Sequence, residues 1–220
     1  MSSRPAIVHA AEPQPRIAAH PIDPLFLRRW SPRAFEPSSM PASDLLTILE
    51  AARWAPSAFN LQPWRFVYLL RKDPRWDAYV ALLDPSNAVW ARHASALVFL
   101  VSDSRMPARG VDAARPAPTH SFDAGAAWAH LALQATALGY QVRAMAGIDF
   151  DAVRETLAVP ERYWIEIAIA IGRQADARRL PAALREREVP SGRRPLSEIA
   201  ARGSFADLAP QHRCKRGGGR

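Results

Sequence analysis

Two arginines and a serine near the N-terminus alternate along the chain in a pattern that suits a phosphate group. Arg29, Ser31 and Arg33 occupy every second position of the segment RRWSPRAF, residues 28–35. Side chains of an extended segment repeat every two residues, so these three project to one side. Pro32 favours the extended backbone at Ser31. Guanidinium groups donate in a planar fork that matches phosphate oxygens. The pattern predicts a phosphate clamp, with a solvated arginine-rich turn as the alternative.

A second polar segment follows and suits a flat ring that carries hydrogen-bonding groups. The segment APSAFNLQPWRF, residues 55–66, places Ser57, Asn60 and Gln62 between an expected helix and an expected strand. Polar side chains between buried elements need partners, and the carbonyls and ring nitrogens of an isoalloxazine supply them. A loop that satisfies its own polar groups is the alternative. Together the two segments favour a phosphorylated heterocycle such as flavin mononucleotide (FMN).

The elements that position these segments follow from apolar periodicity and from helix-stop residues. The expected helices are residues 43–54, 74–83, 122–138 and 149–157, and the expected strands are 65–70, 96–101, 140–145 and 164–171. We expect Ser43 and Asp149 to be N-caps and Gly139 to end its helix in the left-handed conformation. The strand 65–70 is expected to be buried on both faces. Residues 102–120 are expected to form a long loop that shapes a pocket.

Several familiar chemistries lack their motifs in this chain. There is no G-x-G-x-x-G, no P-loop, no G-x-S-x-G and no H-E-x-x-H, and the histidines have no acidic cluster beside them. Cys214 is the only cysteine, which excludes an intrachain disulfide and a cysteine-based metal site. We interpret it as a solvated tail thiol and expect no metal. These absences favour a bound organic cofactor.

Charge and composition limit the partners of the chain. The 220 residues carry a net charge of +8, but residues 1–172 account for only +1 and residues 173–220 for +7. A basic end of this kind is typical of a solvated arm and argues against a duplex-binding face. No apolar run approaches the ~18 residues of a membrane helix, and no signal sequence is evident, so we expect a cytoplasmic protein. The expected divisions are a disordered segment 1–21, a folded domain 22–205 and a basic flexible tail 206–220.

Both motifs resemble the entry motifs of the nitroreductase family, R-R-x-S-x-R-x-F and A-P-S-x-x-N-x-Q-P-W-x-F. The resemblance extends from about residue 25 to about residue 199 and includes later segments at 123–127, 145–147 and 193–196. It implies an α+β fold with a central, mainly antiparallel sheet flanked by helices. It also implies an intertwined homodimer that binds FMN at its interface.

The resemblance also implies the residues of the cofactor site. They are Arg29, Trp30, Ser31, Arg33, Pro56, Ser57, Ala58, Asn60, Asn87, Ala146, Gly147 and Arg193. The arginines and Ser31 would hold the ribityl chain and phosphate, and Asn87 would lie near the pyrimidine edge. Ala146 and Gly147 would offer backbone donors beside the flavin, and residues 56–60 would reach it from the partner subunit. The chain departs from the family pattern at Ser191 and Ala58, where relatives often have a basic residue and a serine. It departs again at Trp90, near which some relatives place a lysine.

The implied reaction takes a hydride from NADH or NADPH at the flavin N5 and passes it to a nitroaromatic or a quinone in a ping-pong cycle. No catalytic side chain is required. The alternatives are a non-catalytic flavin-binding sensor, enone reduction, dehalogenation and a basic-tail module that binds nucleic acid; Ser31 counts against flavin fragmentation. His120 is interpreted as an exposed or capping histidine in preference to one that faces the flavin, and no role is assigned to Arg143, a possible surface charge.

Overall fold

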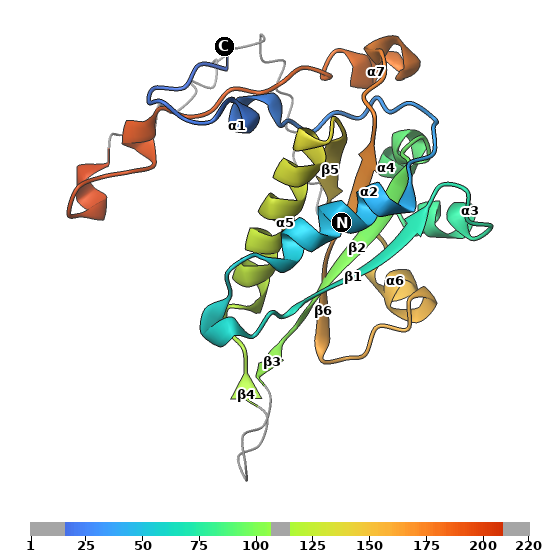
Figure 1. Ribbon diagram of the computed structural model, residues 1–220, viewed down its shortest axis with the longest axis horizontal. Coiled ribbons are helices and arrows are strands. Elements are labelled where there is room, and N and C mark those ends of the chain that lie inside the picture. Colours follow the sequence, from blue (N-terminus) through green and yellow to red (C-terminus); the bar gives the residue numbers. More distant parts are fainter. Residues whose placement is uncertain (1–15, 107–114, 209–220) are drawn as a thin grey trace, which may run out of the picture. The chain divides into compact units, whose positions relative to one another are not determined.

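The computed structural model describes residues 16–106 and 115–208, which form two compact units (Figure 1). The larger unit is Asp23–Val189, and the smaller is made by the terminal segments, of which residues 16–22 and 190–208 are described. The predicted domain boundaries at 21/22 and 205/206 remain predictions. Cys214, most of the predicted N-terminal segment and most of the predicted basic tail lie outside the described residues.

A four-stranded antiparallel sheet forms the centre of the larger unit. Its spatial order is β1 (Trp64–Leu70), β2 (Ala96–Asp103), β6 (Tyr163–Gly172) and β5 (Gln141–Met145). This confirms the expected α+β class and all four expected strands. Strand β2 is almost wholly buried, and β6 is buried over its second half, residues 168–172, as their apolar runs predict.

Strand β1 is not buried on both faces, so that prediction was wrong. Tyr68 in its middle is 40% exposed, and Arg65 is exposed as well. The reason is topological: β1 forms one edge of the sheet, and its apolar sequence does not reveal how many neighbours it has. Part of the expected loop 102–120 is also structured, because β3 (Arg105–Met106) pairs with β4 (Arg115–Pro116); residues 107–114 lie outside the described residues.

Helices cover both faces of the sheet (Figure 1). The α-helices are α1 (Pro24–Arg28), α2 (Ala42–Arg53), α3 (Trp76–Val80), α4 (Pro85–Ala91), α5 (His120–Ala137), α6 (Phe150–Thr156) and α7 (Ala182–Arg185). The short 3₁₀ helices are η1 (Ala58–Asn60), η2 (Ala177–Arg179), η3 (Leu196–Glu198) and η4 (Phe205–Asp207). Helices α2 and α5 cross on one face, and α3, α4 and α6 pack on the other. The sheet is therefore the middle of three layers.

Each face of the sheet has its own apolar core. Leu45 and Ile48 of α2 and Leu131 of α5 are fully buried against the first face. On the second face the core is aromatic: the Tyr79 ring meets Phe99 edge-on at 5.9 Å between centroids, and Trp90 is 1% exposed. Burial of side chains of this size stabilises the fold by about 1.5–3 kcal/mol each.

The helix ends test the expected caps. Asp149 accepts from the Ala152 N–H at 3.0 Å and caps α6 as predicted, and Gly139 has φ +80°, which confirms the left-handed stop after α5. Ser43 is not an N-cap, because α2 already begins at Ala42 behind Pro41, whose fixed φ starts the helix. Helix α4 was not predicted, since seven residues are too few to show a helical period.

No helix in residues 16–106 and 115–208 is both long enough and apolar enough to span a bilayer.

A buried carboxylate ties the start of α5 to the polar loop before β1. Asp123 is 3% exposed, and its Oδ2 accepts from the Ala58 backbone N–H and from the Thr119 hydroxyl, each at 3.2 Å. The bond from Ala58 joins segments that lie 65 residues apart. A buried carboxylate is costly unless it is hydrogen-bonded, so Asp123 specifies where this loop rests.

We expect Asp123→Ala to lower the free energy of unfolding by about 1–3 kcal/mol, because the Ala58 N–H loses its acceptor inside the protein. Asp151→Ala is the matched control, since Asp151 also lies in the first turn of a helix but is exposed; its effect is expected to stay within about 0.5 kcal/mol. Urea denaturation of both variants measures the difference. Equal stabilities would show that Asp123 anchors nothing.

Candidate functional site

The first motif brings two of its predicted site residues together. The Arg29 Nη1 donates to the Ser31 hydroxyl at 3.2 Å, as the expected phosphate clamp requires. Between them, the half-buried Trp30 donates from its indole Nε1 to the Gln174 side chain at 3.3 Å. Trp30 therefore fixes the segment against the chain that follows β6, and it leaves a guanidinium and a hydroxyl facing each other.

Arg33 is engaged by a partner that the sequence did not reveal. Its side chain, 13% exposed, forms an ion pair at 3.8 Å with Glu188, whose side chain is 2% exposed. The Glu188 Oε1 also accepts the backbone N–H groups of Arg33 and Ala34 at 2.6 and 2.8 Å. Burial lowers the pKa of the Arg33 guanidinium, and the Glu188 charge partly offsets that effect. The Glu188 Oε2 has no hydrogen-bond partner among the described residues.

Arg143, to which the sequence assigned no role, is part of this cluster and is not a free surface charge. It lies on β5, and its guanidinium donates to the Ser31 backbone carbonyl. The guanidinium carbon lies 5.7 Å from the centroid of the Trp90 ring, within cation–π range. Burial, and then the charge of Arg33, lower the pKa of Arg143 to about 10, which still leaves it protonated at pH 7. An arginine between the apolar Val142 and Ala144 of a strand was the available signal.

Two further predicted residues meet at the end of β5. The Asn87 side-chain amide on α4 donates to the Gly147 carbonyl at 3.0 Å, and the Asp84 N–H donates to the same oxygen at 3.1 Å. A Cβ at position 147 would lie 2.5 Å from Asp84 Oδ2 and 2.6 Å from Asn87 Nδ2. Glycine is therefore required here by close approach. The neighbouring Ala146 is exposed.

The loop predicted to reach a partner subunit is strained and exposed. Phe59, Asn60 and Gln62 have φ of +52°, +54° and +48°, a left-handed conformation that costs non-glycine residues free energy. The Ser57 hydroxyl accepts from the Gln62 N–H at 2.9 Å. Some polar groups of the loop therefore have hydrogen-bond partners within the loop, as the alternative interpretation of this segment expects. Pro56 and Asn60 are exposed. Strain of this kind persists only where surrounding contacts enforce it, which is typical of functional loops.

Arg193 lies in the smaller unit. Its Nη1 donates to the Gly192 carbonyl at 2.8 Å and to the Ser191 hydroxyl at 3.3 Å. Its role in cofactor binding stays a prediction.

His120 is neither exposed nor a capping residue, so that interpretation was wrong. It is the first residue of α5, and its side chain is 19% exposed. Its Nδ1 lies 2.6 Å from the Ser102 hydroxyl, which in turn donates to Glu166. The Ser121 hydroxyl donates to the same Glu166 oxygen at 2.7 Å. Because the Ser102 hydrogen is directed to Glu166, the Ser102 oxygen accepts from the His120 Nδ1–H.

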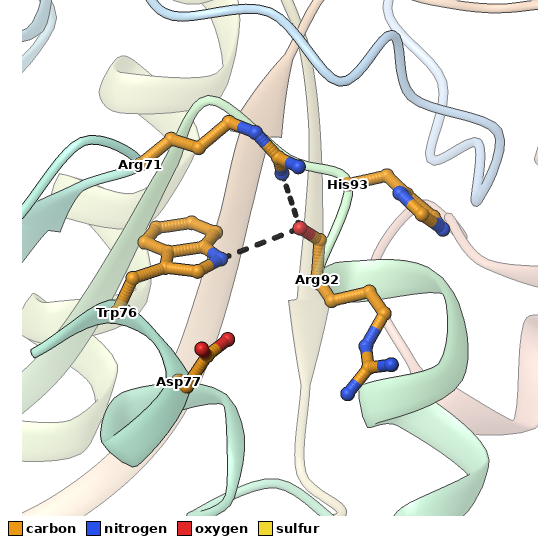
Figure 2. Close-up of a pocket in the computed structure, with 5 residues that line it drawn as sticks. All are labelled: Arg71, Trp76, Asp77, Arg92 and His93. Atoms are coloured by element: carbon orange, nitrogen blue, oxygen red, sulfur yellow. Dashed lines mark hydrogen bonds between the residues drawn. The ribbon is translucent and has the colours of Figure 1, made fainter. Parts of the chain in front are cut away.

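A surface pocket of about 340 Å³ lies at the other end of β1 from the strained loop (Figure 2). Its lining residues are Arg71, Trp76, Asp77, Arg92 and His93. The Arg71 guanidinium and the Trp76 indole both donate to the Arg92 carbonyl, so they hold the turn that leads into β2. Burial first, and the charges of Arg71 and Arg92 next, lower the pKa of His93. No predicted site residue lines this pocket, and its hydrogen bonds serve the scaffold.

The described residues contain no group of three or more His, Cys, Asp or Glu side chains arranged to hold a metal ion.

Comparison with known proteins decides the family. The model of the nitroreductase family matches residues 27–84 and 69–173, which include both motifs and the strands of the central sheet. The chain belongs to the nitroreductase family. The resemblance drawn from the two motifs is therefore confirmed.

Three relatives of this nitroreductase-family chain cover most of its length. A crystal structure described as an oxidoreductase containing FMN is 49% identical, with a TM-score of 0.84, over 86% of this chain and 96% of that one. A Desulfovibrio desulfuricans protein solved in complex with FMN is 28% identical, with a TM-score of 0.64, over 84% of this chain and 99% of that one. An NADH dehydrogenase of Thermus thermophilus is 30% identical over 79% of this chain and 91% of its own.

We expect Gly147→Ala to destabilise the protein by about 1–3 kcal/mol, because the added methyl group displaces Asp84 or breaks the bond from Asn87. Gly125→Ala is the matched control: Gly125 lies exposed in α5, and a Cβ there meets nothing within 4 Å. That substitution is expected to stabilise the helix by about 0.5–1 kcal/mol. Thermal unfolding of the two variants checks the opposite signs, and a shift of the same sign and size in both would contradict the close approach.

Proposed function

We propose that this chain is an FMN-dependent oxidoreductase that takes a hydride from NADH or NADPH and delivers it to an electron-poor acceptor such as a nitroaromatic or a quinone. The observation that carries the proposal is that Arg29 and Arg143 both donate to Ser31, to its hydroxyl and to its backbone carbonyl. Arg33 lies two residues further along the same motif, where it is paired with Glu188. Such an excess of positive charge is stabilised by an anionic ligand. The 49% identical relative is described as containing FMN.

The clamp fits a phosphate. Arg29 and Ser31 face each other and offer guanidinium and hydroxyl donors from one segment. We also propose Arg193 as a phosphate ligand, on the family resemblance of its sequence segment alone. The proposed ligands at this end are thus Arg29, Ser31 and Arg193, with Arg33 and Trp30 beside them.

The end of β5 fits a flat ring. Gly147 carries no side chain, and a Cβ there would collide with Asp84 and Asn87, so these two side chains pack directly against its backbone. Asn87 lies against that backbone through its bond to the Gly147 carbonyl. We assign Asn87, Ala146 and Gly147 to the isoalloxazine, with Asn87 at the pyrimidine edge.

A homodimer completes the site. Strand β1, which follows the loop with Pro56, Ser57, Ala58 and Asn60, forms one edge of the sheet, and β5 forms the other. The two edge strands are three strand spacings apart, about 14 Å. A partner copy is therefore a simpler source of the loop residues at the flavin than the same chain. Phe59 and Phe122, which flank the Ala58–Asp123 bond, are 79% and 80% exposed. Exposed aromatics on a strained loop support a surface that another copy covers.

The protein's contribution to the reaction is binding and electrostatics. Bound FMN supplies hydride transfer at its N5. Arg29 and Ser31 would anchor the phosphate, Asn87, Ala146 and Gly147 would contact the ring, and the guanidiniums of Arg33 and Arg143 would add positive potential to the site. The strained loop of the partner copy limits the space in which the nicotinamide and the acceptor alternate, which gives ping-pong kinetics.

We expect the purified protein to carry or take up FMN and to show the absorption of a bound oxidised flavin. NADH or NADPH should bleach that absorption without an acceptor, and a nitroaromatic or a quinone should restore it, because the two half-reactions share one site. Anaerobic stopped-flow spectroscopy separates the two steps. Protein that binds FMN but stays oxidised with both nicotinamides would point to a flavin-binding sensor, and protein that takes up no FMN would refute the proposal.

We expect Arg29→Ala and Arg193→Ala each to weaken FMN binding by about 1.5–3 kcal/mol, roughly 10- to 150-fold in Kd, because each removes a charge-assisted phosphate contact. Arg28→Ala is the matched control, since Arg28 is the exposed neighbour at the end of α1. Titration of flavin fluorescence gives the three dissociation constants. Riboflavin, which lacks the phosphate, should bind wild type and variants alike, and unchanged FMN affinity in both variants would exclude the phosphate clamp.

A further inference from the structure

Arg143 carries a positive charge that its surroundings neutralise incompletely. The charges that act on it come from Arg33, Glu188 and Arg187, so two of the three are positive. Glu188 is already paired with Arg33 and with two backbone N–H groups. A partly buried cation that shares one carboxylate with other cations is costly, and such a charge is retained at sites where it acts on a ligand.

A second arginine shows what the same contacts do when they serve the scaffold alone. Arg71 also donates to a backbone carbonyl, that of Arg92, and its guanidinium carbon lies 5.9 Å from the Trp76 ring (Figure 2). Arg143 makes the same pair of contacts, with the Ser31 carbonyl and the Trp90 ring. The two arginines differ in their surroundings. Arg71 lines the pocket that contains no predicted site residue, whereas Arg143 contacts Ser31 of the proposed phosphate clamp.

The contacts of Arg143 connect the two ends of the proposed flavin site. Ser31 belongs to the phosphate clamp, and Trp90 lies on α4, one helical turn after Asn87. The Trp90 side chain is 1% exposed and carries no charge, so the cation at this point of the site comes from β5. Arg33 and Arg143 together form a cationic pair beside the segment that binds the cofactor.

We propose that Arg143 is a cofactor-tuning residue whose guanidinium, with that of Arg33, stabilises reduced FMN more than oxidised FMN. The inference rests on the proposed function. When NAD(P)H delivers a hydride to N5, its electron pair leaves one negative charge on the ring system and NAD(P)⁺ is released. A positive charge beside the ring is attracted to that anion and has little effect on the neutral oxidised ring. The midpoint potential of the bound flavin therefore rises.

The test compares Arg143→Met and Arg143→Lys with wild type and with Arg71→Met in the full-length protein. Arg143→Met is expected to bind reduced FMN at least tenfold more weakly relative to oxidised FMN, which lowers the two-electron midpoint potential by about 30 mV or more. Arg143→Lys keeps the charge and should recover most of the potential. Arg71→Met loses the corresponding carbonyl bond and ring contact, so it should lower the melting temperature and leave the potential unchanged.

Dye-equilibration measurements of the potential, with fluorescence titration of oxidised FMN, give the readouts. Three results would overturn the assignment of Arg143 and leave the proposed function in place. They are an unchanged potential in Arg143→Met, an equal shift of the potential in Arg71→Met, and a potential in Arg143→Lys as low as that in Arg143→Met. If the wild-type protein takes up no FMN, both the assignment of Arg143 and the proposed function are refuted. If Arg143→Met does not fold, Arg143→Gln decides, because it removes the charge and keeps a donor for the Ser31 carbonyl; an unchanged potential in that variant overturns the assignment.

Discussion

The site depends on how the segment 33–36 is held against the chain that follows β6. The Ala175 N–H donates to the Ala34 carbonyl, and the Glu36 N–H donates to the Arg173 carbonyl, each at 2.9 Å. The Glu188 carboxylate accepts the next backbone donors along the same segment. Phe35, 2% exposed, anchors the segment in the core with its ring 6.1 Å from that of Trp90. Because this backbone is fixed on several sides, Ser31 and Arg33 keep their positions without a ligand.

Because that segment is fixed, the positive charges of Arg33 and Arg143 are held close together in a partly buried environment. Arg33 and Arg143 both lose hydration there, and burial is the largest cause of the lowered pKa of each. A scaffold selected for stability alone would place apolar side chains at these positions, since a buried ion pair rarely repays its desolvation. Local rules that are broken without a gain in stability mark functional sites. The cluster around Ser31 is such a case, whereas the Arg71 contacts in Figure 2 complete a turn.

The order of the strands explains why one copy of the chain supports only part of the proposed site. Strands β1 and β5 lie at opposite edges of the sheet, so the strained loop before β1 and the glycine turn after β5 are separated by the two buried central strands. The bond from Ala58 to Asp123 then turns the loop toward the start of α5. In the proposed homodimer, a second copy that covers this surface would bring its loop to the flavin without any change in the fold of either chain.

The four strands of the central sheet, the longer helices and the caps at Asp149 and Gly139 could be predicted from the sequence, because these follow from local periodicity and local backbone preference. The sequence also determined the pairing of Arg29 with Ser31, two positions apart in an extended segment. Tertiary structure decided what depends on distant partners: that β1 is an edge strand, that Glu188 binds a segment 155 residues away, and that Arg143 contacts Ser31 across 112 residues. Such contacts produce no periodic pattern in the sequence, since they form only when folding brings distant segments together. Arg143, for example, reaches Ser31 only because the sheet places its edge strand β5 against the clamp.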